Sequence, residues 1–227
     1  MCWGLSQVFA LFWEFSMQSI ILFGVLVSTY LMVIAKRTPA LIRSFRYQSF
    51  CLFLATVIIA LREHELDLYV VAGLLFILKV VFIPQLLYRT IKKIKASEEL
   101  GLFINPQLSL LWALGFTYLS WVFAVYLIGA HDAVQVIMLA IAFFVVLAGI
   151  FLMIFRMTAL AQIIGLLVME NGIFLLASMV SGGMPFFVEI AIFFDVFVSV
   201  LIMGFFVYKI NKFFTHIDVN KLSRLKG

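Results

Sequence analysis

Apolar runs separated by short polar breaks follow one another along almost the whole chain. Each run is close to the length that an α-helix needs to cross a bilayer, which is ~20 residues. The second run is shorter, and we expect its helix to extend back toward Arg43. The pattern predicts an all-α, polytopic membrane protein with about seven transmembrane helices, at residues 15–35, 47–61, 67–90, 107–129, 133–155, 158–180 and 186–208.

Composition supports the same fold class. Of the 227 residues, 66% are hydrophobic and 12% are charged, whereas a soluble domain is roughly 45–50% apolar and ~25% charged. A water-soluble globule is therefore excluded. The start of the chain has no basic leader and no cleavage site, so we expect the first helix to be retained rather than removed as a signal peptide.

Basic residues are concentrated on one side of the predicted bundle. Fourteen of the 16 Lys and Arg residues lie in every second polar segment between the predicted helices or after the last helix. The polar segments on the opposite side of the bundle contain only Arg62. Because loops rich in Lys and Arg stay in the cytoplasm, we expect the N-terminus outside and the C-terminus in the cytoplasm. This asymmetry accounts for the net charge of +5 without a nucleic-acid partner.

Motifs for bond-making chemistry are missing from the sequence. Cys2 and Cys51 are the only cysteines, and the three histidines lie far apart. No spacing typical of a zinc site, an iron–sulfur cluster, a phosphate loop or a catalytic nucleophile occurs. We expect no metal, no cofactor and no catalytic centre on this chain, which by itself is not an enzyme.

The two ends of the chain resemble each other at offsets between 116 and 122 residues. We infer two three-helix repeats of the same orientation with one helix inserted between them; the alternative is that apolar helices resemble one another by composition alone. The inferred parts are a first repeat, an inserted helix, a second repeat and a cytoplasmic tail, at residues 1–100, 101–130, 131–211 and 212–227. The matching segments are Arg37–Leu41 with Arg156–Leu160, Gln48–Phe50 with Glu170–Gly172, and Lys79–Ile94 with Asp195–Ile210.

Four ionisable residues fall inside the predicted helices: Lys79, Glu170, Glu189 and Asp195. A charge at a helix centre costs roughly 2.5–3.5 kcal/mol to insert, so these side chains must face protein or water. In one interpretation, Lys79 neutralises one acid and the pair only locks helices together. In the other, which we favour, the four residues form part of a proton path, because one lysine leaves two acids over and burial favours their neutral, proton-carrying form.

Three further residues are predicted to make contacts between helices. Asn171 and Gly172 follow Glu170 directly and would permit a close helix approach and an interhelical hydrogen bond. Gln48, which the repeat aligns with Glu170, is placed in the same group. Pro84 predicts a kink in the third helix, just after Lys79.

Specific segments of the chain closely resemble component E of hydrogenase-4. The resemblance covers most of the chain and is strongest over its last third. The matching segments are Gln162–Gly172, Val188–Ile192 with Asp195 after it, Asp218–Leu222 and Leu225–Gly227, and in the first half Arg46–Ser49 and Ile77–Val80 with Pro84 after it.

This resemblance implies a non-catalytic membrane subunit of a group 4 NiFe hydrogenase or formate hydrogenlyase-type complex, related to respiratory complex I, in the inner membrane of a prokaryote. The implied partners are antiporter-like membrane subunits, a membrane anchor subunit and hydrogenase subunits, and the NiFe centre and iron–sulfur clusters would lie on those partners. The implied function is translocation of H⁺ or Na⁺ coupled to hydrogen redox chemistry. Two alternatives stay open: a purely structural linker between antiporter-like subunits, and an independent small secondary transporter.

The last three helices are similar to the K subunit of complex I and to the C subunit of multisubunit cation/proton antiporters. The K-type subunit carries one acid on each of its last two helices, and Glu189 matches the second. The first acid, counted from Gly165, falls at Leu167 here, and Glu170 lies three residues farther along nearly the same helix face. Asp195 and Lys79 resemble the charged pairs of antiporter-like subunits.

Overall fold

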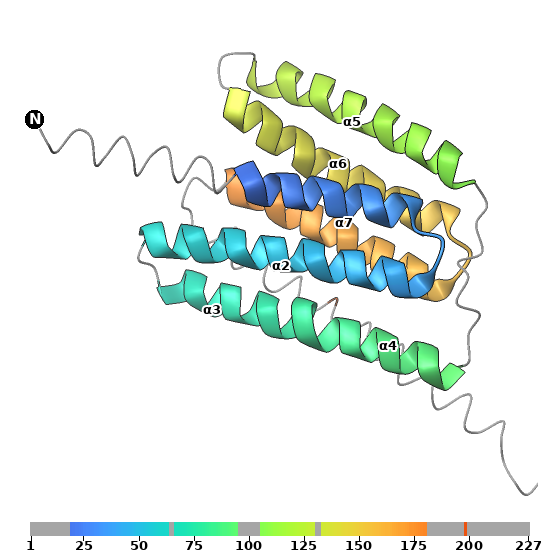
Figure 1. Ribbon diagram of the computed structural model, residues 1–227. Coiled ribbons are helices and arrows are strands. Elements are labelled where there is room, and N and C mark those ends of the chain that lie inside the picture. Colours follow the sequence, from blue (N-terminus) through green and yellow to red (C-terminus); the bar gives the residue numbers. More distant parts are fainter. Residues whose placement is uncertain (1–18, 64–65, 95–104, 130–132, 181–197, 199–227) are drawn as a thin grey trace, which may run out of the picture.

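Long helices make up nearly all of the chain that the computed structural model describes, which is residues 19–63, 66–94, 105–129, 133–180 and 198 (Figure 1). These described residues contain no strand, so the predicted all-α class is confirmed for them. In chain order the helices are an unlabelled one, Ser19–Ile34, then α2 (Thr38–Glu63), α3 (Leu66–Leu75), η1 (Phe76–Phe82), α4 (Ile83–Ile94), α5 (Pro106–Ile128), α6 (Ala133–Phe155) and α7 (Ala159–Val180).

Five stretches of helix are long and apolar enough to cross a membrane, and the Ser19–Ile34 helix is apolar but shorter. The chain is therefore a helical membrane protein. Six of the seven predicted helices coincide with described ones, whereas the seventh, at 186–208, lies outside the described residues, so a total of seven is not confirmed. The five stretches are Thr38–Leu61, Tyr69–Arg89, Pro106–Ile128, Ala133–Phe155 and Ala159–Ser178.

The second helix starts earlier than the apolar run predicted. We expected residues 47–61 with an extension toward Arg43, but α2 begins at Thr38. Its first turn is closed by hydrogen bonds from the backbone of Ala40 and Leu41 to the Arg37 oxygen, both 3.1 Å long. The predicted helix was too short because we looked for a continuous apolar run, which Arg43 interrupts. Arg43 is exposed, and an exposed charged side chain can lie on a helix without ending it.

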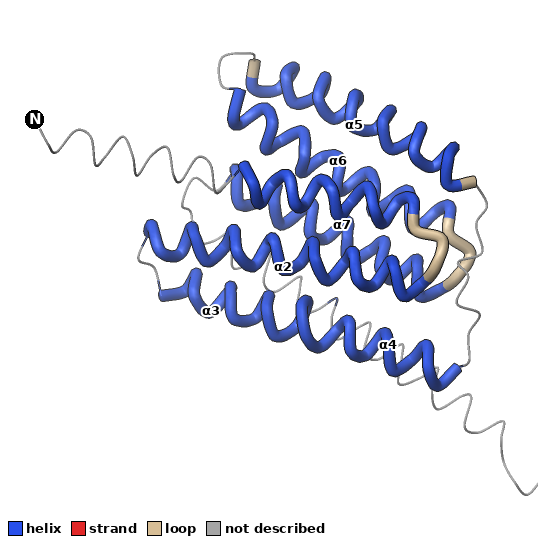
Figure 2. Tube along the Cα trace, viewed as in Figure 1, coloured by secondary structure: helices blue, strands red, loops and turns tan. Residues whose placement is uncertain are grey.

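The helices lie side by side in one bundle, with α5 at one edge and the continuous α3–η1–α4 helix at the opposite edge (Figure 1). The central helices share one large apolar core to which the Ser19–Ile34 helix, α2, α4, α6 and α7 all contribute. The short turns at 35–37 and 156–158 lie at the same end of the bundle (Figure 2). The start of α5 and the end of α4 lie at that end too.

Glycines allow α6 and α7 to pack with their backbones in contact. A Cβ atom added at Gly149 of α6 would overlap the backbone of Met169 and lie 2.7 Å from the oxygen of Gly165 on α7. One added at Gly172 would lie 2.7 Å from the backbone nitrogen of Val146. Only residues without a side chain permit so close an approach, which fixes the position of the central part of α7 against α6.

A π-helical segment, η1, interrupts the third span at its centre. Pro84 follows this segment, and proline offers no N–H to the carbonyl four residues before it and pushes that carbonyl away. The N–H of Ile83 bonds the oxygen of Leu78, five residues back, which is the spacing of a π-helix. This wider turn lies just before the position where we expected a kink, and Lys79 is buried within it.

Candidate functional site

Lys79 and Glu170 form an ion pair inside the bundle. Lys79 comes from η1 and Glu170 from the middle of α7; Nζ lies 3.6 Å from Oε2, and each side chain is only 2% exposed. An isolated buried charge would be costly, and an oppositely charged neighbour offsets much of that cost. The structure thus brings together two of the four residues predicted to form a proton path. The other two, Glu189 and Asp195, lie outside the described residues.

Asn171 is a closer neighbour of the lysine than Glu170 is. Lys79 Nζ donates a hydrogen bond to Asn171 Oδ1 across 2.9 Å, compared with 3.6 Å to the Glu170 oxygen. Asn171 is fully buried. Because the amide and the carboxylate are consecutive on α7, the ammonium group can approach both at once.

The amide of Asn171 continues the contacts toward the first helices. Its Nδ2 donates to Gln48 Oε1 of α2 at 3.0 Å and to Ser49 Oγ at 3.4 Å. Gln48 Nε2 donates to Thr29 Oγ1 on the Ser19–Ile34 helix at 2.8 Å, and Thr29 donates to the Val25 carbonyl of its own helix at 2.7 Å. We call the six side chains of Lys79, Glu170, Asn171, Gln48, Ser49 and Thr29 the polar cluster.

The polar cluster joins four helical segments through buried contacts. All six of its residues are at most 2% exposed. Buried polar groups of this kind are costly unless they are bonded to one another, and in a bilayer no water replaces a lost partner. A carboxyl group beside an ammonium group can hold or transfer a proton within the membrane, so the cluster is the candidate functional site.

The structure places Gln48, Asn171 and Gly172 against neighbouring helices. Gln48 and Asn171 bond each other across α2 and α7, and Gly172 faces Val146 of α6. Metal binding has no candidate in the part of the chain that the structure describes: no three His, Cys, Asp or Glu side chains there lie close enough together to hold an ion.

Thr29 and Ser49 belong to the site, but sequence reasoning did not select them. Hydroxyl side chains are common in membrane helices, where they often bond a carbonyl of their own helix, and Thr29 does that as well. The available signal was the position of the Ser28–Thr29 pair inside an otherwise apolar run.

Arg156 is a second feature that the sequence did not reveal. We counted it among the basic loop residues, but it is 2% exposed. Its Nη2 donates to the Val33 carbonyl in the last turn of the Ser19–Ile34 helix, and its own carbonyl accepts from Gln162 Nε2 at 3.2 Å. Burial lowers the pKa of the guanidinium to about 10, so it is still charged at neutral pH. Arg156 therefore joins the two turns at one end of the bundle.

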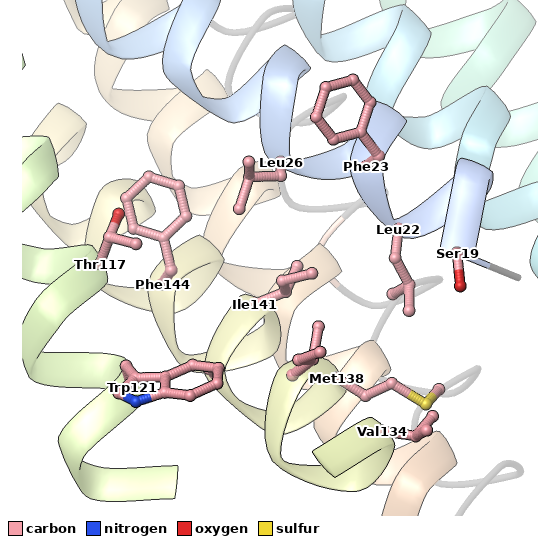
Figure 3. Close-up of a pocket in the computed structure, with 12 residues that line it drawn as sticks. Ser19, Leu22, Phe23, Leu26, Thr117, Trp121, Val134, Met138, Ile141 and Phe144 are labelled. Carbon is pink, nitrogen blue, oxygen red and sulfur yellow. The ribbon is translucent and has the colours of Figure 1, made fainter.

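An apolar pocket of about 370 Å³ lies between the Ser19–Ile34 helix, α5 and α6. Figure 3 shows Phe144, Trp121 and Leu26 facing it from three different helices. Its lining shares no residue with the polar cluster. The pocket suits hydrocarbon rather than ions, because its lining contains no charged side chain.

Comparison with known proteins gives one informative similarity. The chain is 26% identical over 204 residues to the uncharacterized protein Rv0085 of Mycobacterium tuberculosis, and the match covers 89% of this chain and 93% of the mycobacterial protein. No model of a known protein family matches the chain, and no solved structure matches it. The similarity spans nearly the full length of both proteins, so it includes the helices that carry the polar cluster.

Proposed function

We propose that this chain is a non-catalytic membrane subunit of a group 4 NiFe hydrogenase-like complex, related to complex I, in which buried charges contribute to ion translocation. The observation that carries the proposal is the Lys79–Glu170 pair, 3.6 Å apart and buried in the middle of spanning helices. The resemblance of the sequence to component E of hydrogenase-4 supplies the kind of complex. Hydrogen chemistry, the NiFe centre and the iron–sulfur clusters would belong to partner subunits.

The pair suits ion translocation because its charge balance can change inside the membrane. An acid and an ammonium group stabilise each other as ions, and adding a proton to the acid leaves the ammonium charge unbalanced. Intramembrane ionisable residues commonly mark proton or ion pathways. We propose that Glu170 and Lys79 act together with Glu189 and Asp195, and that the ion is H⁺ or Na⁺.

The proposed orientation has the N-terminus outside and the C-terminus in the cytoplasm of a prokaryotic inner membrane. It rests on the positive-inside rule. The turns at 35–37 and 156–158 lie at the same end of the bundle, as this orientation requires. Lys36 and Arg37 are exposed there.

Extraction of the tagged chain from native membranes with a mild detergent, followed by mass spectrometry, tests the assembly. We expect antiporter-like subunits together with hydrogenase and iron–sulfur subunits in stoichiometric amounts. A chain that is purified without partners would contradict the proposal. If that chain also transports ions when it is reconstituted alone in liposomes, it is an independent secondary transporter.

Glu170→Gln tests the role of the ion pair, because it keeps the size of the side chain and removes its charge. We expect intact complexes whose ion translocation into membrane vesicles falls about tenfold or more, while their redox activity persists. Ser178→Ala is the matched control, because it removes another polar group of α7, one that bonds the Leu175 carbonyl at 2.8 Å. Unchanged translocation by intact complexes would refute a relay, and complexes that fall apart would favour the structural linker.

A further inference from the structure

The hydrogen bonds from Lys79 to Val25 all run in one direction. Starting at the ammonium group, each group donates to the next: Lys79 to Asn171, Asn171 to Gln48, Gln48 to Thr29, and Thr29 to the Val25 carbonyl. The donor-to-acceptor distances along this series are 2.9, 3.0, 2.8 and 2.7 Å. The series crosses from η1 through α7 and α2 to the Ser19–Ile34 helix.

Both ends of the series require the same orientation of the two amides. An ammonium group can only donate, so Asn171 must turn its oxygen toward Lys79 and its nitrogen toward Gln48. At the other end Thr29 gives its hydrogen to Val25, so its oxygen accepts and Gln48 must present its nitrogen to it. Turning over either amide would place donor against donor or acceptor against acceptor.

The series can hold the lysine but cannot carry its proton away. It ends on a backbone carbonyl, which accepts a hydrogen bond and passes no proton on. The intermediate carboxamides have no acidic proton to exchange. Any proton that the Lys79–Glu170 pair exchanges must therefore leave by another route.

We infer that Thr29 and Gln48 are positioning residues, which act through Asn171 to hold the Lys79 ammonium group beside Glu170. This inference rests on the proposed function of the pair. The Thr29 hydroxyl fixes the Gln48 amide, the Gln48 amide fixes the Asn171 amide, and the Asn171 oxygen fixes Nζ 3.6 Å from the carboxylate. In this account Thr29, Gln48 and Asn171 act on the ion only through Lys79.

Ser28 supplies a matched control within the same helical turn. Ser28 Oγ also donates to the Val25 carbonyl, at 2.8 Å, and is also buried. The serine hydroxyl receives no hydrogen bond from Gln48, whose Nε2 donates to Thr29. Ser28→Ala and Thr29→Val thus each remove one buried hydroxyl bonded to the same carbonyl, but only the second change interrupts the series.

Side-chain NMR of the full chain in lipid nanodiscs tests the series directly. We expect Thr29→Val to shift the amide resonances of Gln48 and Asn171 and the amine resonance of Lys79. Gln48 loses the acceptor of its amide nitrogen, and the resulting movement of its amide passes through Asn171 to Lys79. Ser28→Ala should leave these resonances in place, and Thr29→Ser, which keeps the hydroxyl, should restore them. Unchanged Asn171 and Lys79 resonances in Thr29→Val would overturn the inference.

The pH profile of ion translocation by the intact complex tests the functional consequence. We expect Thr29→Val to move the pH of half-maximal rate and to lower the maximal rate about three- to tenfold, with Ser28→Ala and Thr29→Ser unchanged. Gln48→Met, which removes the amide at similar size, should act like Thr29→Val and replaces it if the threonine variant fails to assemble. A Thr29→Val profile equal to that of Ser28→Ala overturns the inference even when Glu170→Gln abolishes translocation. If Glu170→Gln has no effect, it is the proposed function that fails.

Discussion

The two sides of the bundle are held together by different forces. Around α2, η1 and α7, buried polar groups bond one another in a fixed order. Around α5 many contacts are between aromatic rings, such as Phe123 with Phe143 at 4.7 Å and Phe116 with Phe151 at 5.8 Å, although the hydroxyl groups of Tyr30 and Thr117 also share a hydrogen bond. The buried face of α5 is a narrow stripe of small residues, Ser109, Ala113, Ser120 and Ala124.

The two sides of the bundle differ in how strictly their packing depends on particular side chains. Hydrogen bonds between buried polar groups tolerate one arrangement, because any other leaves a group without a partner. Ring contacts and small residues tolerate many side chains of similar volume. Within an 18-residue apolar stretch of each helix, 17% of the residues are buried in α5 and 56% in α7. The structure thus contains a strictly specified half, which carries the candidate site, and a peripheral helix with wide apolar surface.

The largest expected effect comes from removing one charge of the polar cluster. Lys79→Met should lower the free energy of unfolding by about 3–5 kcal/mol, because the carboxylate of Glu170 loses its counter-charge. The double variant Lys79→Met/Glu170→Gln should recover much of this loss. Unfolding of the purified chain in detergent by SDS titration measures both. Arg89→Met, at an exposed position of the same span, is the control and should change little. Equal free energies of unfolding for the single and double variants would contradict the view that specific buried polar contacts hold this side of the bundle together.

Next in size is the contact that joins the two turns. Arg156→Gln should lower the free energy of unfolding by about 1.5–3 kcal/mol, the value of a hydrogen bond with a charged donor. The loss should be the same at pH 6 and pH 8, since a pKa of about 10 leaves the guanidinium charged at both. Burial has lowered this pKa, so deprotonation of Arg156 raises wild-type stability only above about pH 10. SDS titration at each pH measures this loss of unfolding free energy, and Arg43→Gln, at an exposed position, is the control. A loss that differs between pH 6 and pH 8 would argue against this account.

The smallest effects compare two glycines, one on each side. Gly149→Ala should cost about 1–3 kcal/mol, because its methyl group meets the backbone of α7, and overpacking of this kind strains a core. Gly115→Ala on α5 has no atom within 4 Å of its added carbon and should be neutral or slightly stabilising. Melting temperatures in detergent measure the difference. Similar melting temperatures for the two variants would show that α6 and α7 can move apart to admit a methyl group more easily than their close contact indicates.

The sequence predicted the helices of the described residues well because length and apolarity decide which segments cross a bilayer. It misplaced the start of α2 because exposed charges such as Arg43 occur on helices as well as in loops. It predicted a kink at Pro84 but not the π-helical segment η1 that precedes the proline. The conformation that a helix adopts before a proline also depends on the helix packed against it, here α2.

The candidate site was predictable in its charges and not in its connections. Lys79 and Glu170 are recognisable in the sequence because ionisable residues within apolar runs are rare. Three acids were available to pair with the lysine, and sequence position alone could not select among them. The signal for Thr29, a Ser28–Thr29 pair in an apolar run, is much weaker, because a threonine that faces lipid and one that orients an amide can have the same neighbours in the sequence.

The contacts of Arg156 and Asn171 have a consequence for the order in which the protein is made. Lys79 and its partner Asn171 are 92 residues apart in the chain, and Gln48 and Asn171, like Val33 and Arg156, are 123 apart. A chain that enters the membrane helix by helix must therefore insert Lys79 and Gln48 long before α7 emerges from the ribosome. Until then the nascent protein must shelter these groups in water or in the insertion machinery. The arrival of α7 is the step that completes the polar cluster.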